Sequence, residues 1–247
     1  MRLIQAKDYI DISKKAADII AAKILLKPNC MLGLATGSTP IGTYQNLIEK
    51  YEQGELDFSN VHSINLDEYQ GLSKEHPQSY RFFMDTNFFN HINIHLENTF
   101  IPDGLAKDSS IACSQYNDLL TSIGTRDLQL LGIGTNGHIG FNEPSNEFKK
   151  NVHCVQLSDS TIKANSRFFE TIDDVPTFAY TMGIGNIMDS ETILLLASGK
   201  EKAQAIFDSF FGPITPNVQA SILQLHKDVI VIADQEALSI CKEKGVL

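Results

Sequence analysis

A glycine-rich stretch in the middle of the chain places an imidazole close to a carboxylate. It runs from Leu131 to Pro144 and has the sequence LGIGTNGHIGFNEP. His138 has a side chain that titrates near neutral pH, and Glu143 is near enough in sequence to orient the ring or to relay a proton. Glycine-rich turns also occur without function, and a lone histidine is often only a satisfied polar residue. This stretch predicts a catalytic turn that needs support from the rest of the chain.

The residues before this turn predict the strand that positions it. Asp127 to Ile133 (DLQLLGI) is a short apolar run, which is typical of a strand with both faces covered. The glycines that follow allow a sharp turn, and Asn136 tolerates left-handed backbone angles. We expect the strand to end near Gly132 to Gly134 and the turn to point into a cleft.

A second strand and turn predict an anion site. Cys30 to Ala35 (CMLGLA) has the pattern of a buried strand, and a helix is expected from Ile41 to Tyr51. Between them lie Thr36, Gly37, Ser38, Thr39 and Pro40, with Pro40 suited to the first helical position. Backbone N–H groups, hydroxyls and a helix N-terminus at one point suit a phosphate monoester. Neither a GK[ST] ending nor GxGxxG spacing indicates a nucleotide. Simple capping of the helix by Ser or Thr is the alternative.

A third strand candidate, Val61 to Leu66 (VHSINL), runs directly into Asp67 and Glu68. In open parallel sheets, ligands bind beyond the carboxyl ends of the strands. We therefore expect Asp67 to share one cleft with His138 and with the turn from Thr36 to Thr39, which we call the phosphate turn. The alternative is a solvated acidic turn, which is the more frequent outcome for such a pair.

Three other groups of residues are assigned to structure rather than to chemistry. His91 and His95 are four residues apart, but no third ligand follows at metal-binding spacing, so no metal site is predicted. The aromatic residues Phe82, Phe83, Phe88 and Phe89 are expected to pack in the core. The four cysteines are scattered without a CxxC pair, which predicts neither a disulfide framework nor a thiolate zinc site.

Composition limits the classes of partner. The 247 residues are 43% hydrophobic and carry a formal net charge of -10, which argues against nucleic acid and anionic membranes as partners. A local cationic pocket for a phosphorylated metabolite stays compatible with that charge. The N-terminus lacks the apolar core of a signal peptide, and no later run is long enough to span a bilayer. We expect a soluble, cytoplasmic protein.

The remaining chain predicts alternating helices and strands, and hence an α/β domain. Helices are expected over 12–26, 108–123, 158–170, 200–210 and 235–244, strands over 2–5, 152–157, 191–197 and 228–233, and extended chain over 176–184. Without repeats or linkers, residues 1–247 are expected to form a single domain. The partly polar unit at about 145–182 is interpreted as a lid that carries Arg167 as an anion ligand, with an ordinary surface ion pair as the alternative. Lys202 adds a positive charge after a further strand.

Seven segments, in order along the chain, resemble the glucosamine-6-phosphate deaminase family. They are LATGSTP at 34–40, NLDEYQGL at 65–72, HPQSY at 76–80, GIGTNGHIGFNEP at 132–144, NSRFF at 165–169, SGKEKA at 198–203 and LQLH at 223–226. The resemblance implies a three-layer α/β/α sandwich with a mostly parallel, Rossmann-like central sheet. It also implies conversion of D-glucosamine 6-phosphate and water to D-fructose 6-phosphate and ammonia, in amino-sugar catabolism, without a metal or organic cofactor.

The resemblance assigns roles to the residues already singled out. Asp67 would take the proton from C2 of the sugar, and His138, supported by Asn136 and Glu143, would open the sugar ring. The phosphate-binding positions match Gly37, Ser38, Thr39, Arg167 and Lys202. Many members have Asp at the position of Asn136, so a neutral group here replaces an anionic partner of His138.

The same resemblance bears on regulation. Long members that respond to an N-acetylated sugar phosphate carry an Arg and a Lys where this chain has His153 and Val155. We therefore expect no allosteric activation, and either a monomer or a small homo-oligomer.

Two alternatives belong to other functional classes. One is a 6-phosphogluconolactonase, a hydrolase of the same fold that shares the phosphate turn and a GxxGH segment, but not IGFNEP or the DEY at 67–69. The other is a non-catalytic sugar-phosphate sensor. Asp67, His138 and Glu143 together argue against a sensor, because binding alone requires neither a base nor an acid.

Overall fold

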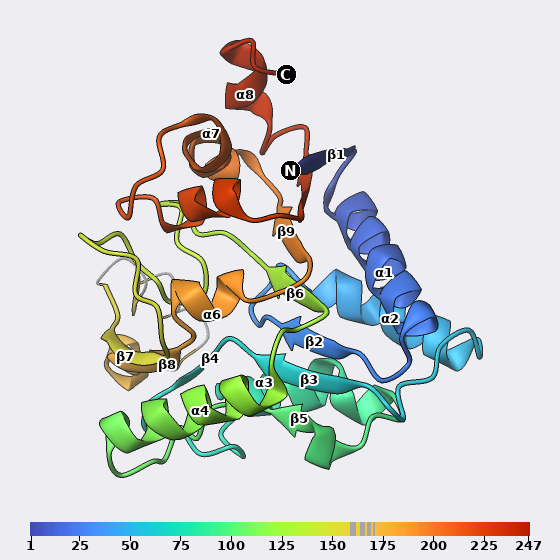
Figure 1. Ribbon diagram of the computed structural model, residues 1–247, viewed down its shortest axis with the longest axis vertical. Helices are drawn as coiled ribbons and strands as arrows, with labels where there is room; N and C mark the ends of the chain where they lie inside the picture. Colours follow the sequence, from blue (N-terminus) through green and yellow to red (C-terminus); the bar gives the residue numbers. More distant parts are fainter. Residues whose placement is uncertain (159–161, 164–165, 167–168, 170) are drawn as a thin grey trace.

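The computed structural model describes residues 1–158, 162–163, 166, 169 and 171–247 (Figure 1). Its centre is a seven-stranded parallel sheet with the strand order β1-β10-β9-β6-β2-β3-β5. These strands are β1 (Arg2–Ala6), β2 (Met31–Leu34), β3 (His62–Asn65), β5 (Thr99–Phe100), β6 (Leu128–Leu131), β9 (Ile193–Ala197) and β10 (Val229–Asp234). A smaller antiparallel sheet has the order β4-β8-β7 and comprises β4 (Asp67–Tyr69), β7 (His153–Gln156) and β8 (Phe178–Thr181).

The helices lie between the strands in the chain. The α-helices are α1 (Tyr9–Leu26), α2 (Ile41–Glu52), α3 (Tyr80–Asn87), α4 (Ser109–Ile123), α6 (Ile184–Met188), α7 (Ala203–Phe211) and α8 (Ser239–Glu243). Short 3-10 helices are η1 (Phe89–His91), η2 (Leu96–Asn98), η4 (Ile172–Asp174), η5 (Lys200–Lys202) and η6 (Gln219–Leu225). The carboxylates of Asp8 and Asp108 accept hydrogen bonds from the first turns of α1 and α4, which fixes where these helices begin.

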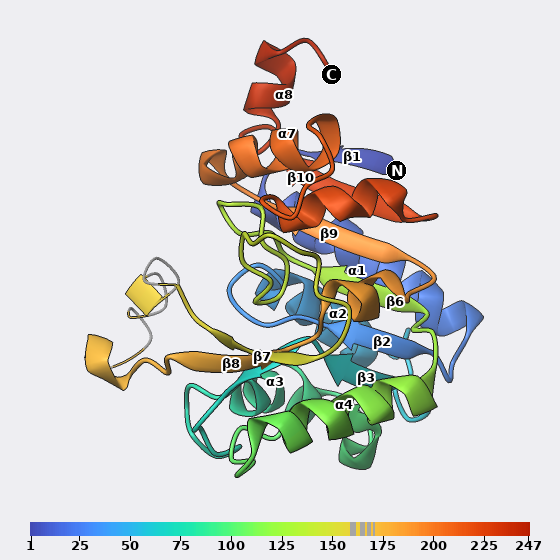
Figure 2. The same ribbon diagram turned by 60° about the vertical axis from the view of Figure 1, so that its left-hand side comes forward.

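The central sheet is covered on both faces, and the alternation of side chains along each strand assigns its residues to two cores. On β9, Leu194 and Leu196 belong to the core that also contains residues of α1, α2 and α3, whereas Ile193 and Leu195 belong to the core that contains residues of α4, α6 and α7. The strand β10 alternates in the same way. The predicted three-layer α/β/α sandwich with a Rossmann-like parallel sheet is therefore confirmed. Figure 2 shows the small sheet projecting to one side of these layers.

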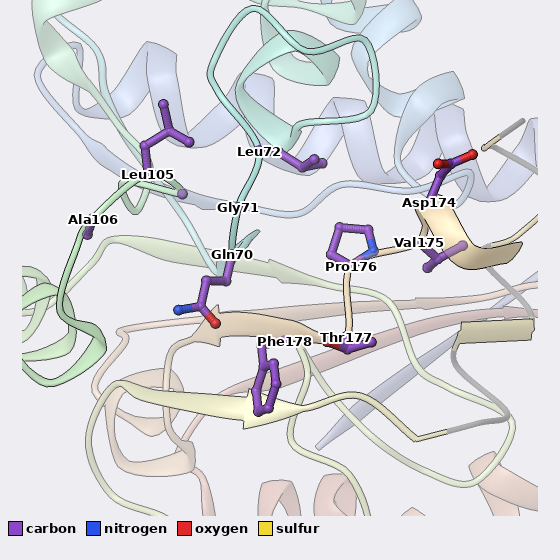
Figure 3. A pocket seen from close by; sticks show the side chains of 11 residues that line it. Gln70, Gly71, Leu72, Leu105, Ala106, Asp174, Val175, Pro176, Thr177 and Phe178 are labelled. Carbon is purple, nitrogen blue, oxygen red and sulfur yellow. The ribbon is translucent and has the colours of Figure 1, made fainter. Parts of the chain in front are cut away.

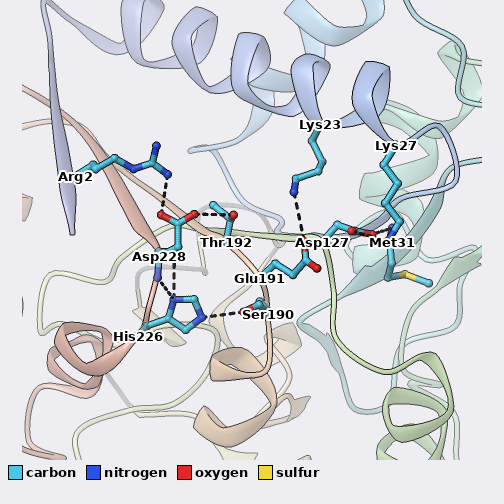
Figure 4. Close-up of polar contacts among 10 residues, drawn as sticks. All are labelled: Arg2, Lys23, Lys27, Met31, Asp127, Ser190, Glu191, Thr192, His226 and Asp228. Atoms are coloured by element: carbon cyan, nitrogen blue, oxygen red, sulfur yellow. Dashed lines mark hydrogen bonds and ion pairs between the residues drawn. The ribbon is translucent and has the colours of Figure 1, made fainter.

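Ion pairs and hydrogen bonds connect residues at the N-terminal ends of the parallel strands (Figure 4). Asp127, before β6, accepts bonds from Lys27 Nζ at 2.7 Å and from the Met31 backbone N–H at 2.8 Å. Asp228, before β10, pairs with Arg2 at 2.7 Å. These polar residues join neighbouring strands to each other and to α1.

Several elements differ from the sequence-based prediction. The segment after Leu66 forms a strand of a second, antiparallel sheet instead of a turn at the end of a parallel strand. Extended chain predicted over 176–184 ends at Thr181, and α6 begins at Ile184. The C-terminal helix is limited to Ser239–Glu243, and the helix α3 was not predicted. Among the four aromatic residues predicted as core, Phe88 and Phe89 are buried, but Phe82 is 37% exposed and lines a cavity beside α3.

Candidate active site

The phosphate turn lies between β2 and α2 and touches the glycine-rich turn. Gly37 has a φ of +86°, which glycine adopts without strain. A Cβ atom placed on Gly132 would stand 3.5 Å from Thr39 Oγ1, so the two turns are in contact. Pro40 occupies the N-cap of α2, one residue earlier than predicted, and no side chain caps the helix. Capping by Ser or Thr is therefore excluded as the reason for the polar turn.

A tyrosine from α1 forms hydrogen bonds with the backbone of the phosphate turn and of α2. The Tyr9 hydroxyl donates to the Ser38 carbonyl at 3.0 Å and accepts from the Gly42 backbone N–H at 2.9 Å. It thereby fixes the turn against the first residues of α2. This contact could not be predicted from the sequence, since Tyr9 is separated from Ser38 by a helix and a strand.

Asp67 lies in β4, and its carboxylate faces the glycine-rich turn. The side chain is only 6% exposed, and its Oδ2 lies 3.5 Å from the point where a Cβ on Gly140 would stand. It makes no hydrogen bond with any residue in the described part of the chain. Burial, together with the nearby charge of Glu68, raises the pKa of Asp67 to about 8. The solvated acidic turn considered from the sequence is wrong, because both carboxylates are buried.

Glu68 points to the other side of β4 and holds the start of α3. Its two carboxylate oxygens accept backbone N–H bonds from Tyr69 at 2.8 Å, Tyr80 at 2.9 Å and Arg81 at 2.9 Å. Burial raises the pKa of Glu68 to about 7, while these three N–H groups act in the opposite direction. Glu68 therefore has a structural role beside Asp67: it fixes the backbone from which the Asp67 side chain extends.

His138, Asn136 and Glu143 form a hydrogen-bonded chain. Asn136 Oδ1 accepts from the His138 backbone N–H at 3.1 Å, and Asn136 Nδ2 donates to Glu143 Oε2 at 2.8 Å. These contacts fix the orientation of the amide, because a backbone N–H only donates and an ionised carboxylate only accepts. His138 Nδ1 lies 2.8 Å from the same Oδ1, so it must carry a proton and donate it. In the neutral ring, Nε2 is then the proton acceptor.

The glycine-rich turn is fastened to β8. The Phe141 backbone N–H donates to Thr181 Oγ1 at 3.1 Å, and Asn142 Nδ2 donates to the Met182 carbonyl at 2.8 Å. Thr181 is also the cross-strand partner of Asp67 in the small sheet. One residue of β8 therefore positions the turn that carries His138 and the strand that carries Asp67. The sequence did not reveal Thr181, because its two contacts are distant in the chain.

Of the two predicted cationic ligands, Lys202 and Arg167, the structure describes only Lys202. Lys202 ends η5, directly after β9 and the turn at Gly199, whose φ is +91°. Asp234 at the end of β10 accepts bonds from Ser198 Oγ at 2.6 Å and from the Gly199 backbone N–H, so this turn is held in place. Arg167 lies outside the described residues. In the described part, no group of three His, Cys, Asp or Glu side chains could hold a metal ion.

A groove and a cavity lie next to the phosphate turn, α3 and the small sheet, and neither is lined by Asp67, Asn136, His138 or Glu143. An open groove of about 610 Å³ lies beyond the ends of β4 and β8 and is lined by Gln70, Leu72, Pro176 and Phe178 (Figure 3). A smaller cavity of about 200 Å³ lies between the phosphate turn and α3, and its lining includes Gly37 and Ser38 as well as five aromatic residues. Its wall includes Tyr69, whose ring lies 4.8 Å from that of Tyr80.

Fold and site together define an α/β enzyme with a buried carboxylate and an oriented histidine beside the polar turn that precedes α2. Residues 8–228 match the sequence profile of the glucosamine-6-phosphate isomerases/6-phosphogluconolactonase family. The chain belongs to this family. No helix in the described part of the chain is both long and apolar enough to cross a membrane.

Individual relatives distinguish the two branches of the family. The chain is 58% identical to a glucosamine-6-phosphate deaminase of Lachnoclostridium phytofermentans, over 94% of this chain and 98% of the relative. It is 55% identical to that of Clostridioides difficile, over 97% and 96%. A solved monomeric glucosamine-6-phosphate deaminase superposes with a TM-score of 0.95 at 48% identity, covering 97% of this chain and 100% of that one. A 6-phosphogluconolactonase from Trypanosoma brucei shares the fold, with a TM-score of 0.79 at 16% identity over 97% and 98% of the two chains.

Proposed function

We infer that this chain converts D-glucosamine 6-phosphate and water to D-fructose 6-phosphate and ammonia. The observation that carries the inference is the contact between buried Asp67 and the turn that bears His138, in a chain 58% identical to a deaminase. An aldose-to-ketose conversion needs a base beside C2, and ring opening needs proton transfer at the anomeric hydroxyl and the ring oxygen. Asp67 and His138 supply these two functions from separate elements.

The substrate phosphate is bound by the turn from Thr36 to Thr39. Its backbone N–H groups and hydroxyls, at the N-terminus of α2, supply neutral donors and a favourable helix dipole. Lys202 supplies positive charge, and Arg167 is assigned the same role from the sequence. A phosphate held here fixes one end of the sugar, so that the other end reaches the catalytic residues.

His138 opens the sugar ring. Its Nε2 atom accepts the proton of the anomeric hydroxyl and returns a proton to the ring oxygen, which yields the open-chain aldehyde. The imidazolium formed in between is stabilised through Asn136 and by the carboxylate of Glu143, whose Oε2 lies 3.5 Å from His138 Nδ1. Because the amide of Asn136 is neutral, that stabilisation comes mainly from dipoles and from the more distant charge.

Asp67 then removes the C2 proton of the open-chain sugar and delivers it to C1, while the C1 oxygen gains a proton and the C2 amine loses one. The product of this step carries a hydroxyl at C1 and an imine at C2, to which water adds before ammonia leaves. The raised pKa of Asp67 makes its carboxylate a stronger base than an exposed one. A protonated substrate amine beside Asp67 lowers that pKa, so binding of the substrate itself favours the ionised, active form.

One experiment tests the proposed function. Purified protein is incubated with glucosamine 6-phosphate, and ammonia and fructose 6-phosphate are measured as they form. We expect the two products in equal amounts. Hydrolysis of 6-phosphogluconolactone without ammonia release from the amino sugar would instead assign the chain to the other branch of the family.

A monomer is the assembly that the comparisons support best. The solved relative at 48% identity is described as monomeric, and it covers 97% of this chain. Light scattering of the purified protein is expected to give the mass of one chain, 27.4 kDa. We also place the enzyme in the cytoplasm, where its four cysteines would remain free thiols.

A further inference from the structure

Two cysteines from distant parts of the chain lie on one surface groove. Cys113 belongs to α4 and Cys154 to β7, and the helix packs against the strand (Figure 2). Both side chains are partly buried, and both line an open groove of about 430 Å³. Ser109, Ser114, Asn117 and His153 line the same groove. By contrast, Cys30 and Cys241 are completely buried in the two cores.

The contacts of the two thiols place them next to each other. Cys154 Sγ donates a long hydrogen bond of 3.8 Å to Gln70 Oε1, and Gln70 Nε2 donates to Ser109 Oγ at 2.9 Å. The first turn of α4 is thereby joined to β7 through the residue that follows β4. Burial raises the pKa of the Cys113 thiol to about 11; the thiol of Cys154 adds to this effect, and its backbone N–H acts against it. Both effects act on the Cys113 sulfur, so Cys154 must adjoin it.

We propose that Cys113 and Cys154 form a redox-reactive pair, which closes to a reversible disulfide when the protein meets a peroxide. Two S–H bonds break and one S–S bond forms, and the two electrons and two protons pass to the peroxide; when this is hydrogen peroxide, its O–O bond breaks to give two molecules of water. A reducing dithiol reverses the reaction by thiol–disulfide exchange. This proposal needs no substrate and is independent of the proposed function.

The disulfide would tie α4 to β7 and close a covalent ring from residue 113 to residue 154. The ring contains β6 and the whole glycine-rich turn with His138. Cross-linking restricts the unfolded chain, so the oxidised protein is expected to melt at a higher temperature than the reduced protein. The raised pKa of both thiols leaves little thiolate at neutral pH, so closure is expected to accelerate about tenfold per pH unit between roughly pH 7 and 9.

The test uses the full chain and hydrogen peroxide. The protein is treated at pH 8.5 (a value chosen at about the ordinary thiol pKa), remaining thiols are alkylated, and peptides are mapped by mass spectrometry without reduction. We expect one peptide pair linked through Cys113 and Cys154, which disappears after treatment with dithiothreitol. Cys113→Ser and Cys154→Ser should each abolish the link, whereas Cys30→Ser and Cys241→Ser should retain it.

A second measurement keeps the test independent of folding defects in the variants. The melting temperature of the parent protein is measured before oxidation, after oxidation and after reduction. A reversible rise that Cys154→Ser lacks supports the intramolecular disulfide. Recovery of the two cysteines only as separate oxidised acids, or only in links between two chains, overturns the proposal.

Discussion

Asn136 Oδ1 lies 2.8 Å from His138 Nδ1, so a neutral amide stands between the imidazole and the nearest carboxylate. The amide orients the ring and selects its tautomer without adding a charge. An aspartate at this position would do the same and also stabilise the imidazolium. The pair therefore separates two effects that a carboxylate combines: orientation of the histidine, and electrostatic stabilisation of its protonated form.

This relationship gives the first prediction. Asn136→Leu removes the acceptor for His138 Nδ1, and we expect kcat to fall by about 100-fold with little change in KM, because ring opening slows while phosphate binding persists. Asn136→Asp should keep the orientation of the ring and add a negative charge that stabilises the imidazolium, so we expect its kcat to stay within a few-fold of the parent value. Steady-state rates across pH measure both effects. Unchanged kcat in Asn136→Leu would mean that the amide does not act through His138.

Asp67→Asn is predicted to abolish turnover while substrate binding is largely retained. The amide has the size of the carboxyl group but cannot take the proton from C2. Turnover is measured as ammonia release, and binding by calorimetry with glucosamine 6-phosphate. The matched control is Asp118→Asn on the exposed face of α4, which should leave both unchanged. Substantial isomerisation by Asp67→Asn would remove Asp67 from the role of base.

The same substitution is predicted to stabilise the protein at alkaline pH. The pKa of Asp67 rises from 3.8 in the unfolded chain to about 8 in the folded protein, so between these values the folded state binds more protons. The free energy of unfolding therefore falls as pH rises from about 4 to 8, by about 1.4 kcal/mol for each pH unit between the two pKa values. Asp67→Asn removes this loss, and its advantage over the parent protein should grow between pH 4 and pH 8. Urea unfolding at several pH values measures it, and an advantage that does not change with pH would contradict the buried, protonated carboxyl.

Lys202→Ala is predicted to raise KM through loss of a charge-assisted hydrogen bond to the phosphate. The expected cost is about 1.5 to 3 kcal/mol. Lys200→Ala is the matched control, because Lys200 is exposed in the same short helix and should have little effect. Glucosamine without its phosphate should be a very poor substrate for the parent enzyme. Equal use of the two sugars would require another function for the turn from Thr36 to Thr39.

Substrate saturation is predicted to be hyperbolic and unchanged by N-acetylglucosamine 6-phosphate. An effector shifts an equilibrium only through its different affinities for two states. At the two positions expected to bind such an effector, this chain has His153 and Val155. Val155 is apolar, and burial lowers the pKa of His153, which favours its neutral form. Initial rates with and without the acetylated sugar phosphate measure the effect. Sigmoidal kinetics that become hyperbolic on its addition would show an effector site elsewhere.

The sequence predicted the central sheet and its longer helices because their patterns are local. Strands such as Ile193–Ala197 and Val229–Asp234 are apolar runs, and α1 has apolar residues at helical spacing and an aspartate cap. Each of these signals lies within a few residues of the element that it predicts. The contact between the two turns followed from the rule that ligands bind at the carboxyl ends of parallel strands.

The small sheet could not be predicted in the same way. The strand β4 has only three residues, two of them acidic, and its partner Thr181 is far away in the chain. An acidic pair usually lies in solvent, and only the tertiary structure supplies the three N–H groups that hold Glu68 in the interior. The sequence therefore identified Asp67 as chemically important but gave the wrong local structure for it.

Thr181 has a further consequence for the two catalytic elements that it joins. It is the cross-strand partner of Asp67 on one side and of His153 on the other, so the three residues form one row across the small sheet. The middle residue of this row also accepts the hydrogen bond from the Phe141 backbone N–H, so the base and the glycine-rich turn share one support. A substitution at Thr181 would therefore alter both catalytic elements at once, whereas His153 reaches them only through Thr181.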